Sequence, residues 1–413
     1  MDERVGAEAR LEVTTTAAIA GGAALARDPG GRVIFVAGAL PGERVAVALT
    51  EARKDFARAQ VVEVLDPSAD RVVPPCPHVG RGCGGCDLQH VRAAAQPELK
   101  RTIVVDALRR IGRVPDADDL VSVGPALAST RYRTTVRGAV HADGFGFRAG
   151  GSHDVVDIDH CLVAHRLVDE IIATGRFLAT DEVVIRVGDA TGDRLVLVTP
   201  TDDAVAVEVE VPDDVVVVDR SHADGHEAPW IHEVVAGARL RISATSFFQA
   251  RPDGAAALVD AVRDLGGAEL AAAGSVVDAY AGVGLFAATV VPERALVTAV
   301  EWSRSSVADA RVNLAGRRAT IRRSDVARWR PEPADVVVAD PARTGLGRRA
   351  TEVLAATGAS VVVLVSCDPA AFARDVTLLR DHGFALAETR VIDLFPHTHH
   401  IEVVSRFVRD APS

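Results

Sequence analysis

Residues 241–413 alternate Val-rich strands with helical stretches, and this pattern restricts the fold more than any other feature of the sequence. The apolar runs S-V-V-D-A-Y, A-L-V-T-A-V-E, A-D-V-V-V-A-D and S-V-V-V-L-V-S are each followed by a stretch with helical periodicity. Such alternation predicts a parallel, doubly wound (Rossmann-like) α/β sheet with ligands at the carboxyl ends of its strands. Runs that are apolar at nearly every position indicate strands buried on both faces.

Two further domains are expected before this sheet, because 413 residues exceed the length of one ordinary domain. Residues 5–66 contain short strands separated by Gly/Pro turns, which favours a small, OB-like β-barrel. Residues 67–240 form a β-rich central region that carries a cysteine-containing segment. A helix near 91–112 interrupts it and could pack on the C-terminal domain. The predicted fold class is therefore a multidomain protein.

The composition limits where the protein works and what it binds. The first residues, M-D-E-R-V-G, do not resemble a secretory signal, and the apolar window 271–291 contains Asp278 and three glycines, unlike a membrane span. We expect a cytoplasmic monomer without membrane association. A net charge of −11 argues against a general nucleic-acid coat, although Arg clusters at 101–113 and 131–137 are either solvated faces or local RNA contacts.

The segment D-A-Y-A-G-V-G-L-F predicts a nucleotide-type ligand site. Its Gly282 and Gly284 lie between a strand and a helix, where glycine lets backbone approach a ligand. Glu301 ends the next strand, about twenty residues further on, and is placed to accept hydrogen bonds from a ribose diol. Ala287 replaces the third glycine of the dinucleotide fingerprint, and an aspartate opens the motif. The site therefore resembles one for S-adenosylmethionine more than one for NAD.

Two later strand ends carry further candidates. Asp340 ends the strand in A-D-P-A-R, where its carboxylate either projects into the ligand crevice or opens a turn before proline. Cys367 follows the apolar strand V-V-V-L-V-S and precedes a helix. A helix N-terminus lowers a thiol pKa, so this position favours a nucleophile over an inert buried cysteine.

Near the C-terminus, the segment F-P-H-T-H-H-I-E supplies Glu402, which we interpret as a catalytic base. Its histidines, His397, His399 and His400, do not have the H-E-x-x-H spacing of a zinc protease. They are interpreted as loop scaffolding or RNA contacts.

The other four cysteines are predicted thiolate ligands. Cys76, Cys83 and Cys86 lie in C-P-H-V-G-R-G-C-G-G-C, and Cys161 follows a histidine in D-I-D-H-C. Cytoplasmic cysteines serve metals or catalysis more often than disulfides. Four thiolates suit zinc or an iron–sulfur cluster, and the C-x6-C-x2-C spacing matches neither a zinc ribbon nor a radical-forming cluster motif. Both metals remain open at this point.

Together, these motifs resemble the 5-methyluridine RNA methyltransferases of the RlmD/RlmC/TrmA type over nearly the whole chain. The segment R-V-I-F-V-A-G-A-L-P-G-E-R-V looks like a TRAM domain, and the cysteine segment with the later H-C-L is similar to the family's 4Fe-4S signature. S-F-F-Q, D-A-Y-A-G-V-G-L-F, D-P-A-R, V-S-C-D-P and F-P-H-T-H-H-I-E follow in the family's order.

The resemblance implies an S-adenosylmethionine-dependent enzyme that methylates uracil C5 in RNA. It makes Cys367 the nucleophile and Glu402 the base that removes the C5 proton. It assigns contacts to the donor or the target base to Gln249, Tyr280, Glu301, Asp325 and Asp340. It assigns a 4Fe-4S cluster to Cys76, Cys83, Cys86 and Cys161.

Ribosomal RNA is the favoured substrate by this resemblance, and the T-loop of tRNA is the alternative. Two other hypotheses remain. One is a methyltransferase for another base or for DNA, because the nucleophile chemistry suits any pyrimidine C5. The other is a non-catalytic RNA-binding protein that keeps the cluster and the barrel, against which the intact Cys367 and Glu402 argue.

Overall fold

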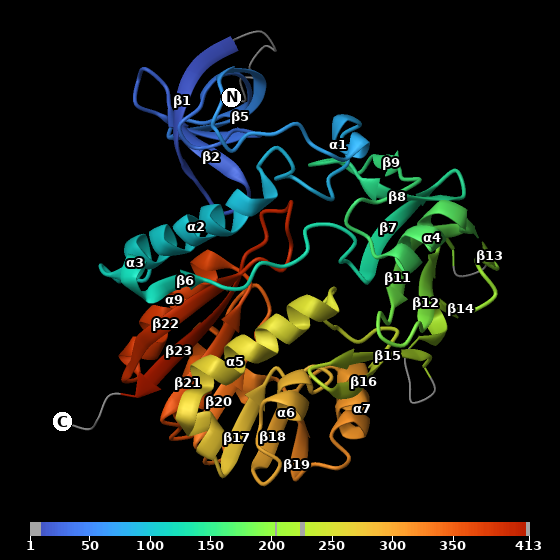
Figure 1. Ribbon diagram of the computed structural model, residues 1–413, viewed down its shortest axis with the longest axis vertical. Helices are drawn as coiled ribbons and strands as arrows, with labels where there is room; N and C mark the ends of the chain where they lie inside the picture. The colour runs from blue at the N-terminus through green and yellow to red at the C-terminus, as the bar shows by residue number, and fades with distance from the viewer. Residues whose placement is uncertain (1–9, 203–204, 224–227, 410–413) are drawn as a thin grey trace.

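The computed structural model describes residues 10–202, 205–223 and 228–409. An N-terminal barrel, a central β-rich region and a C-terminal α/β sheet occupy separate parts of the molecule (Figure 1). This arrangement agrees with the predicted fold class at the level of these three parts. In the described part of the chain, no helix combines the length and apolarity needed to cross a membrane.

The barrel is closed and has the strand order β1-β2-β3-β5-β4. Its strands are β1 (Arg10–Ala18), β2 (Ala23–Arg27), β3 (Val33–Ala37), β4 (Arg44–Ala52) and β5 (Phe56–Asp66). Every second side chain of β3 is buried, and Ile34 and Val36 lie in a core with Val45 and Ala57. The predicted small barrel is confirmed.

The segment after the barrel first contacts the central region, where Cys83 bridges Ala149, and then runs alongside the C-terminal sheet (Figure 1). It contains α1 (Pro77–Gly80), η1 (Ala93–Ala95), α2 (Gln96–Arg110), α3 (Ala117–Leu120) and β6 (Val121–Val123). Helix α2 buries Val104 and Leu108 against the sheet, and β6 adds an edge strand parallel to β22 (Phe384–Ile392). Residues 96–123 therefore pack with the C-terminal sheet, although they precede the domain boundary expected near residue 240.

The central region is built on a six-stranded sheet of order β14-β12-β11-β7-β8-β9. Helix α4 (Arg166–Thr174) covers it with Val168 and Ile171, and two small two-stranded sheets flank it. The strands of this region are β7 (Thr135–His141), β8 (Gly144–Arg148), β9 (Val155–Asp157), β10 (Arg176–Leu178), β11 (Thr180–Val187), β12 (Arg194–Pro200), β13 (Glu208–Glu210), β14 (Val215–Asp219), β15 (Trp230–Val235) and β16 (Ala238–Ser243). A short 3-10 helix, η2 (Arg220–His222), follows β14.

The C-terminal sheet has eight strands in the order β19-β18-β17-β20-β21-β23-β22-β6. Its remaining strands are β17 (Ser275–Ala279), β18 (Leu296–Glu301), β19 (Ala319–Arg323), β20 (Val336–Ala339), β21 (Val361–Ser366) and β23 (Glu402–Arg409). The helices are α5 (Pro252–Ala272), α6 (Leu285–Thr289), α7 (Arg304–Asn313), η3 (Val326–Arg328), α8 (Gly347–Ala355) and α9 (Pro369–Asp381).

Helices cover both faces of this sheet, as the doubly wound prediction requires. One apolar core joins it to α2, α8 and α9, and the other joins it to α5 and α6. The sheet is mixed rather than fully parallel, because β23 pairs antiparallel with both β21 and β22. This difference has a consequence for the site, since an antiparallel strand begins where its parallel neighbours end.

Candidate active site

Five side chains gather at one edge of the C-terminal sheet because of how its strands run. The parallel strands β17, β18, β20 and β21 end at this edge and bring Asp278, Glu301, Asp340 and Cys367 to it. Strand β23 runs the other way, so its first residue, Glu402, lies at the same edge. The strand order reverses between β17 and β20, which is where open α/β sheets bind their ligands.

Glu301 is buried, and two backbone N–H groups hold its carboxylate. Gly282 donates from 3.0 Å and Ser303 from 2.6 Å. The backbone of Gly282 and Gly284 has positive φ, of 55° and 91°, which favours glycine at both positions. The glycine loop and the acidic residue predicted to serve one ligand therefore lie in direct contact.

Asp278 is a site residue that the sequence analysis did not select. It is buried, and one of its carboxylate oxygens accepts a hydrogen bond from the Ala287 N–H at 2.9 Å. Its Oδ1 has no hydrogen-bond partner among the described residues. Burial, followed by the charges of Asp340 and Glu301, raises the pKa of Asp278 to about 7.

A buried carboxylate with one unpaired oxygen at the reversal of strand order fits a ligand that carries positive charge and hydrogen-bond donors. A sulfonium nucleoside such as S-adenosylmethionine meets both requirements. The sequence signal for Asp278 was its position as the first residue of the motif D-A-Y-A-G.

Three other predicted contacts lie around this region. Tyr280 is half-buried, follows β17 with a φ of 62°, and has its pKa raised to about 12 by burial and by the charges of Asp325 and Asp375. Asp325 is exposed and caps η3, accepting from the Ala327 N–H at 2.9 Å. Gln249 is buried in the segment between β16 and α5. The structure thus brings Tyr280 and Asp325 within electrostatic reach of each other.

Cys367 lies between the end of β21 and Asp368, the N-cap residue of α9. Burial, followed by the charges of Glu402 and Asp340, raises the pKa of its thiol to about 12, and Arg343 opposes this shift. The expected lowering of the thiol pKa by the helix N-terminus is therefore wrong for the protein without ligands. Desolvation and two neighbouring carboxylates outweigh the helix dipole, and the thiol is protonated at neutral pH.

Glu402 is buried, with 5% of its surface exposed. Burial and the nearby Asp340 raise its pKa well above the ordinary range of a glutamate, and Arg343 opposes this rise. The pKa of Asp340 rises to about 7 through burial. Two close carboxyl groups of this kind resist being ionised together, so the pair is suited to hold and release a proton near neutral pH.

Arg343, from the D-P-A-R segment, is the second residue that the sequence analysis did not select. It acts on the charges of both Cys367 and Glu402, and its guanidinium donates to the ring of His400 from 3.3 Å. An arginine two residues after a proline carries no strong signal in a single sequence. Only the tertiary structure, in which these strand ends lie together, shows that Arg343 is close to Cys367 and Glu402.

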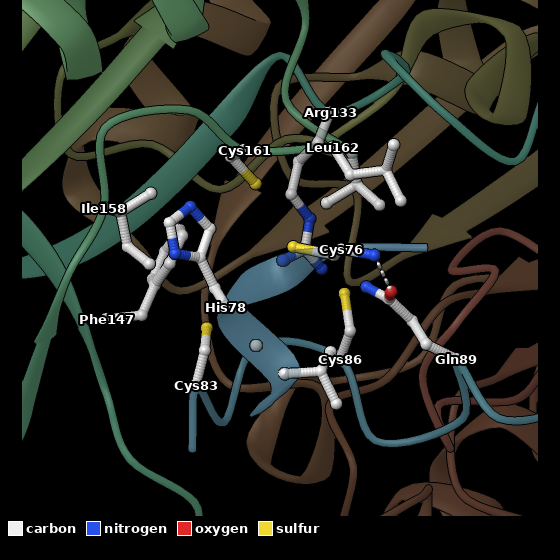
Figure 2. A pocket seen from close by; sticks show the side chains of 13 residues that line it. Cys76, His78, Cys83, Cys86, Gln89, Arg133, Phe147, Ile158, Cys161 and Leu162 are labelled. Atoms are coloured by element: carbon white, nitrogen blue, oxygen red, sulfur yellow. Dashed lines mark hydrogen bonds between the residues drawn. The ribbon is translucent and has the colours of Figure 1, made fainter. Parts of the chain in front are cut away.

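The other four cysteines form a second site, away from the sheet edge. Cys76, Cys83, Cys86 and Cys161 line one cavity, and Figure 2 shows their sulfur atoms facing a common space. Three come from the segment around α1, and Cys161 comes from the connection between β9 and α4. Among the described residues, no three or more His, Cys, Asp or Glu side chains converge on a position for a single metal ion.

The cavity suppresses ionisation of the Cys83, Cys86 and Cys161 thiols. Burial raises the pKa of Cys83 and Cys161, and it raises the pKa of Cys86 to about 12. Neighbouring cysteines add to each of these shifts. Thiols in such surroundings become ligands only when a positively charged centre replaces their protons.

Arg133 also lines this cavity, and it lies 5.4 Å from the ring centroid of Phe395 in a cation–π contact. It belongs to one of the two Arg clusters that were interpreted as solvated faces or RNA contacts. Arg133 is instead half-buried between the cysteine site and the C-terminal segment that leads to Glu402. The pattern R-Y-R did not reveal this inward orientation.

Comparisons with known proteins identify relatives of the chain and of its N-terminal domain. Residues 2–62 match the TRAM domain model. The chain is 37% identical to an uncharacterized RNA methyltransferase of Streptomyces coelicolor, covering 97% of this chain and 93% of that protein. It is 36% identical to the 23S rRNA (uracil(1939)-C(5))-methyltransferase RlmD of Chromohalobacter salexigens, covering 95% of this chain and 88% of that protein.

A solved structure has the same fold. It is the tRNA (uracil-54, C5)-methyltransferase of Pyrococcus abyssi in complex with S-adenosyl-L-homocysteine. The TM-score is 0.73 at 24% sequence identity, and the match covers 96% of this chain and 99% of that chain. The likeness therefore includes the barrel, the central region and the C-terminal sheet.

Proposed function

The chain belongs to the TRAM-domain RNA uracil-C5 methyltransferases, which depend on S-adenosylmethionine, and we propose that it methylates a uridine of ribosomal RNA through a covalent bond to Cys367. The observation that carries the proposal is the meeting of Cys367, Asp340 and Glu402 at the edge where the donor site also lies. The bacterial relative that acts on 23S rRNA supports ribosomal RNA as the substrate.

The first step activates a carbon that is otherwise a poor nucleophile. The Cys367 thiol gives up its proton to water, and the thiolate sulfur bonds to C6 of the uracil, using a sulfur lone pair. The C5–C6 π electrons move to C5 and the C4 carbonyl, which gives an enolate. Covalent catalysis of this kind divides one difficult step into easier ones.

The positive charge of Arg343 favours the thiolate in this step, because it opposes the pKa rise at Cys367. S-adenosylmethionine, when bound, supplies the electrophilic methyl group that the C5 electrons take up. We propose that Asp278, Glu301, Tyr280, Asp325 and Gln249 form its binding site.

The last step restores the aromatic ring. Glu402 removes the proton from C5, its electrons form the C5–C6 double bond, and the C6–S bond breaks to release Cys367. Burial raises the pKa of Glu402 and so makes its carboxylate a stronger base, and general-base catalysis is typically worth about 10²–10⁴-fold. The uracil must leave its stack to reach both residues, at a cost of a few kcal/mol, which favours loops over duplex RNA.

The covalent mechanism is tested with two variants and a methyl-transfer assay. We expect Cys367→Ala to lose methylation while it still binds RNA. We expect Glu402→Gln to accumulate a methylated protein–RNA adduct that survives denaturing electrophoresis, because the C5 proton stays in place and the C6–S bond cannot break. Glu388→Gln is the matched control, since Glu388 is half-exposed on β22 and pairs with Arg390.

Two results would refute the mechanism. One is full activity in Cys367→Ala, and the other is an adduct that forms in that variant as readily as in the natural protein. Absence of any adduct in Glu402→Gln would remove the base assignment alone.

We also propose that Cys76, Cys83, Cys86 and Cys161 hold a 4Fe-4S cluster. The four thiols face one cavity without converging on the position of a single ion, and a single zinc ion needs four ligands at about 2.3 Å. A cluster presents several iron atoms to separate thiolates, and four thiols that line one cavity suit it. Methyl transfer requires no electron transfer, so the cluster is proposed to be structural.

Iron content tests this assignment. Anaerobically purified protein should contain about four iron atoms and absorb visible light, as a Cys₄-ligated cluster does. Cys83→Ser should lose both signals, while Cys367→Ala, which removes the cysteine at the other site, should keep them. Colourless protein with one zinc ion per chain would overturn the cluster assignment.

A further inference from the structure

The loop of residues 393–400 connects β22 to β23 and leads directly to Glu402. We call it the base loop. It has few regular backbone contacts of its own, and its His397 has a positive φ of 69°, a conformation that side chains other than glycine adopt at a cost. Such a loop keeps one shape only when other parts of the protein hold it.

Two side chains each hold one histidine of the base loop by two bonds. Asp87 accepts from the backbone N–H of His399 at 2.8 Å and from the His399 ring. Gln96 accepts from the backbone N–H of His397 at 2.6 Å, and its amide nitrogen lies 3.2 Å from Nδ1 of the same ring. Each contact therefore fixes both the backbone and the side chain at alternate positions of the loop.

The rest of the loop is tied in the same way. Lys100 donates to the Asp393 carboxylate at 2.6 Å and to the Phe395 carbonyl at 3.0 Å. Tyr132 donates from its hydroxyl to the Pro396 carbonyl at 3.0 Å. The backbone N–H of Leu88 donates to the carbonyl of His397. Because several backbone N–H and C=O groups of the base loop have hydrogen-bond partners elsewhere in the protein, the loop is held in a single conformation.

Apart from Tyr132, these holding groups come from one stretch of chain that starts next to the cysteine site. Residues 87–100 follow Cys86 without a break and end within α2. A barrel turn closes over the contact: a Cβ atom added at Gly22 would lie 3.0 Å from the Asp87 carboxylate and 3.1 Å from Cβ of His399. The Asp87–His399 contact therefore lies beside this barrel turn and stays partly exposed, whereas the Gln96–His397 contact is buried.

We propose that Asp87 and Gln96 are positioning residues for the catalytic base. They do not touch the reacting atoms, but they fix the base loop so that Glu402 enters β23 beside Asp340 and Cys367. This inference rests on the proposed function, because it assigns Glu402 its task. It adds that the segment following the cysteines determines the step that Glu402 performs.

The proposal predicts a specific kinetic defect. Cys367 lies between β21 and α9 and outside the base loop, so attack on C6 should survive when the base loop is loosened. Removal of the C5 proton should slow, since it depends on Glu402. Variants of Asp87 or Gln96 should therefore resemble Glu402→Gln in a weaker form, with a lower kcat and an almost unchanged affinity for RNA.

The test compares Asp87→Ala and Gln96→Ala with two matched controls. Asp70→Ala removes an acid that pairs with Arg92 in the same part of the chain, and Glu98→Ala removes an acid of α2 that pairs with Arg101. Neither control residue contacts the base loop. We expect a fall in kcat of about tenfold or more in the first two variants, because a small misplacement of a catalytic group has large effects. We expect the methylated adduct with unmodified RNA to accumulate in them but not in the controls.

Hydrogen–deuterium exchange of the peptide containing residues 393–400 gives the second measurement. Exchange should accelerate in Asp87→Ala and Gln96→Ala at unchanged iron content and RNA affinity, and Gln96→Glu, which keeps the acceptor for the His397 N–H, should recover part of the protection. Unchanged exchange, or faster exchange without adduct accumulation while Glu402→Gln does trap the adduct, would overturn the positioning role. Failure of Glu402→Gln itself would instead refute the proposed function.

Discussion

At the scale of single residues, the active site brings together three side chains whose pKa values lie above their usual ranges. Burial places the pKa of the Cys367 thiol at about 12 and that of Asp340 at about 7, and it raises the pKa of Glu402. The largest cause of each shift is the removal of the group from water, and neighbouring carboxylates add to the shifts of Cys367 and Glu402. Without ligands, the site therefore favours the protonated form of the Cys367 thiol, and Arg343 is the neighbouring charge that opposes this.

The raised thiol pKa predicts how the rate of adduct formation depends on pH. Only the thiolate attacks, and below a pKa of about 12 its fraction grows about tenfold for each pH unit. We therefore expect the rate with Glu402→Gln protein to rise throughout pH 6 to 9. The measurement is a single-turnover time course of adduct formation at each pH.

Arg343 should shift this profile. Arg343→Ala removes the charge that opposes the pKa rise, so the same rate should be reached only at higher pH, while Arg343→Lys should lie closer to the natural protein. A profile that is flat, or one that Arg343→Ala leaves in place, would show that the thiol is ionised by other means.

At the scale of secondary-structure elements, the barrel pairs strands whose outward side chains form an aromatic surface. Alternation along β3 and β5 turns Ile34 and Ala57 inward and leaves Phe35 and Phe56 half-buried outside, with ring centroids 5.8 Å apart. The Arg58 guanidinium lies 5.8 Å from the Phe35 ring centroid. Paired aromatic rings with an arginine are the groups that small barrels use to stack single-stranded bases.

Phe35→Ala and Phe56→Ala should therefore weaken RNA binding without changing kcat. Base–aromatic stacking is worth about 1–3 kcal/mol per base, and a filter-binding titration at fixed salt measures the loss. Trp230→Ala is the matched control, since Trp230 is also partly exposed and has an arginine, Arg241, 4.0 Å from its ring centroid. If Trp230→Ala lost as much RNA affinity as the two phenylalanine variants, the barrel surface would have no specific role in binding.

At the scale of the whole molecule, side chains distant in the sequence join its parts. Lys100 of α2 and Asp393 of the base loop form a buried ion pair of 2.6 Å. Arg71, after the barrel, binds the fully buried Glu43 of the barrel and the Gly38 carbonyl. Because of these contacts the barrel, the cysteine segment and the C-terminal sheet meet around the loop that leads to Glu402.

Breaking one partner of the buried pair should destabilise this assembly. Lys100→Met leaves the Asp393 carboxylate buried without its cation, which typically costs about 3–5 kcal/mol. The double variant Lys100→Met/Asp393→Leu should recover most of the lost stability, because it leaves no unpaired charge in the protein interior. Urea denaturation midpoints measure both effects, and a single variant as stable as the natural protein would contradict the prediction.

The sequence by itself determined the classes of element and most of the chemistry. Val-rich runs indicated strands buried on both faces, and the barrel followed from short strands with Gly/Pro turns. The strand-end positions of Glu301, Asp340 and Cys367 followed from the parallel arrangement, because every parallel strand ends at the same edge. Local spacing carries this information, so a single sequence is enough to find it.

Only the tertiary structure decided how distant segments meet. It placed β23 antiparallel beside β21, which brings Glu402 to Cys367, and it made residues 87–100 the support of the base loop. It also showed the thiol pKa to be raised rather than lowered, and it revealed Asp278 and Arg343. Burial, charge proximity and long-range pairing depend on distances in space, which the spacing of residues along a chain does not fix.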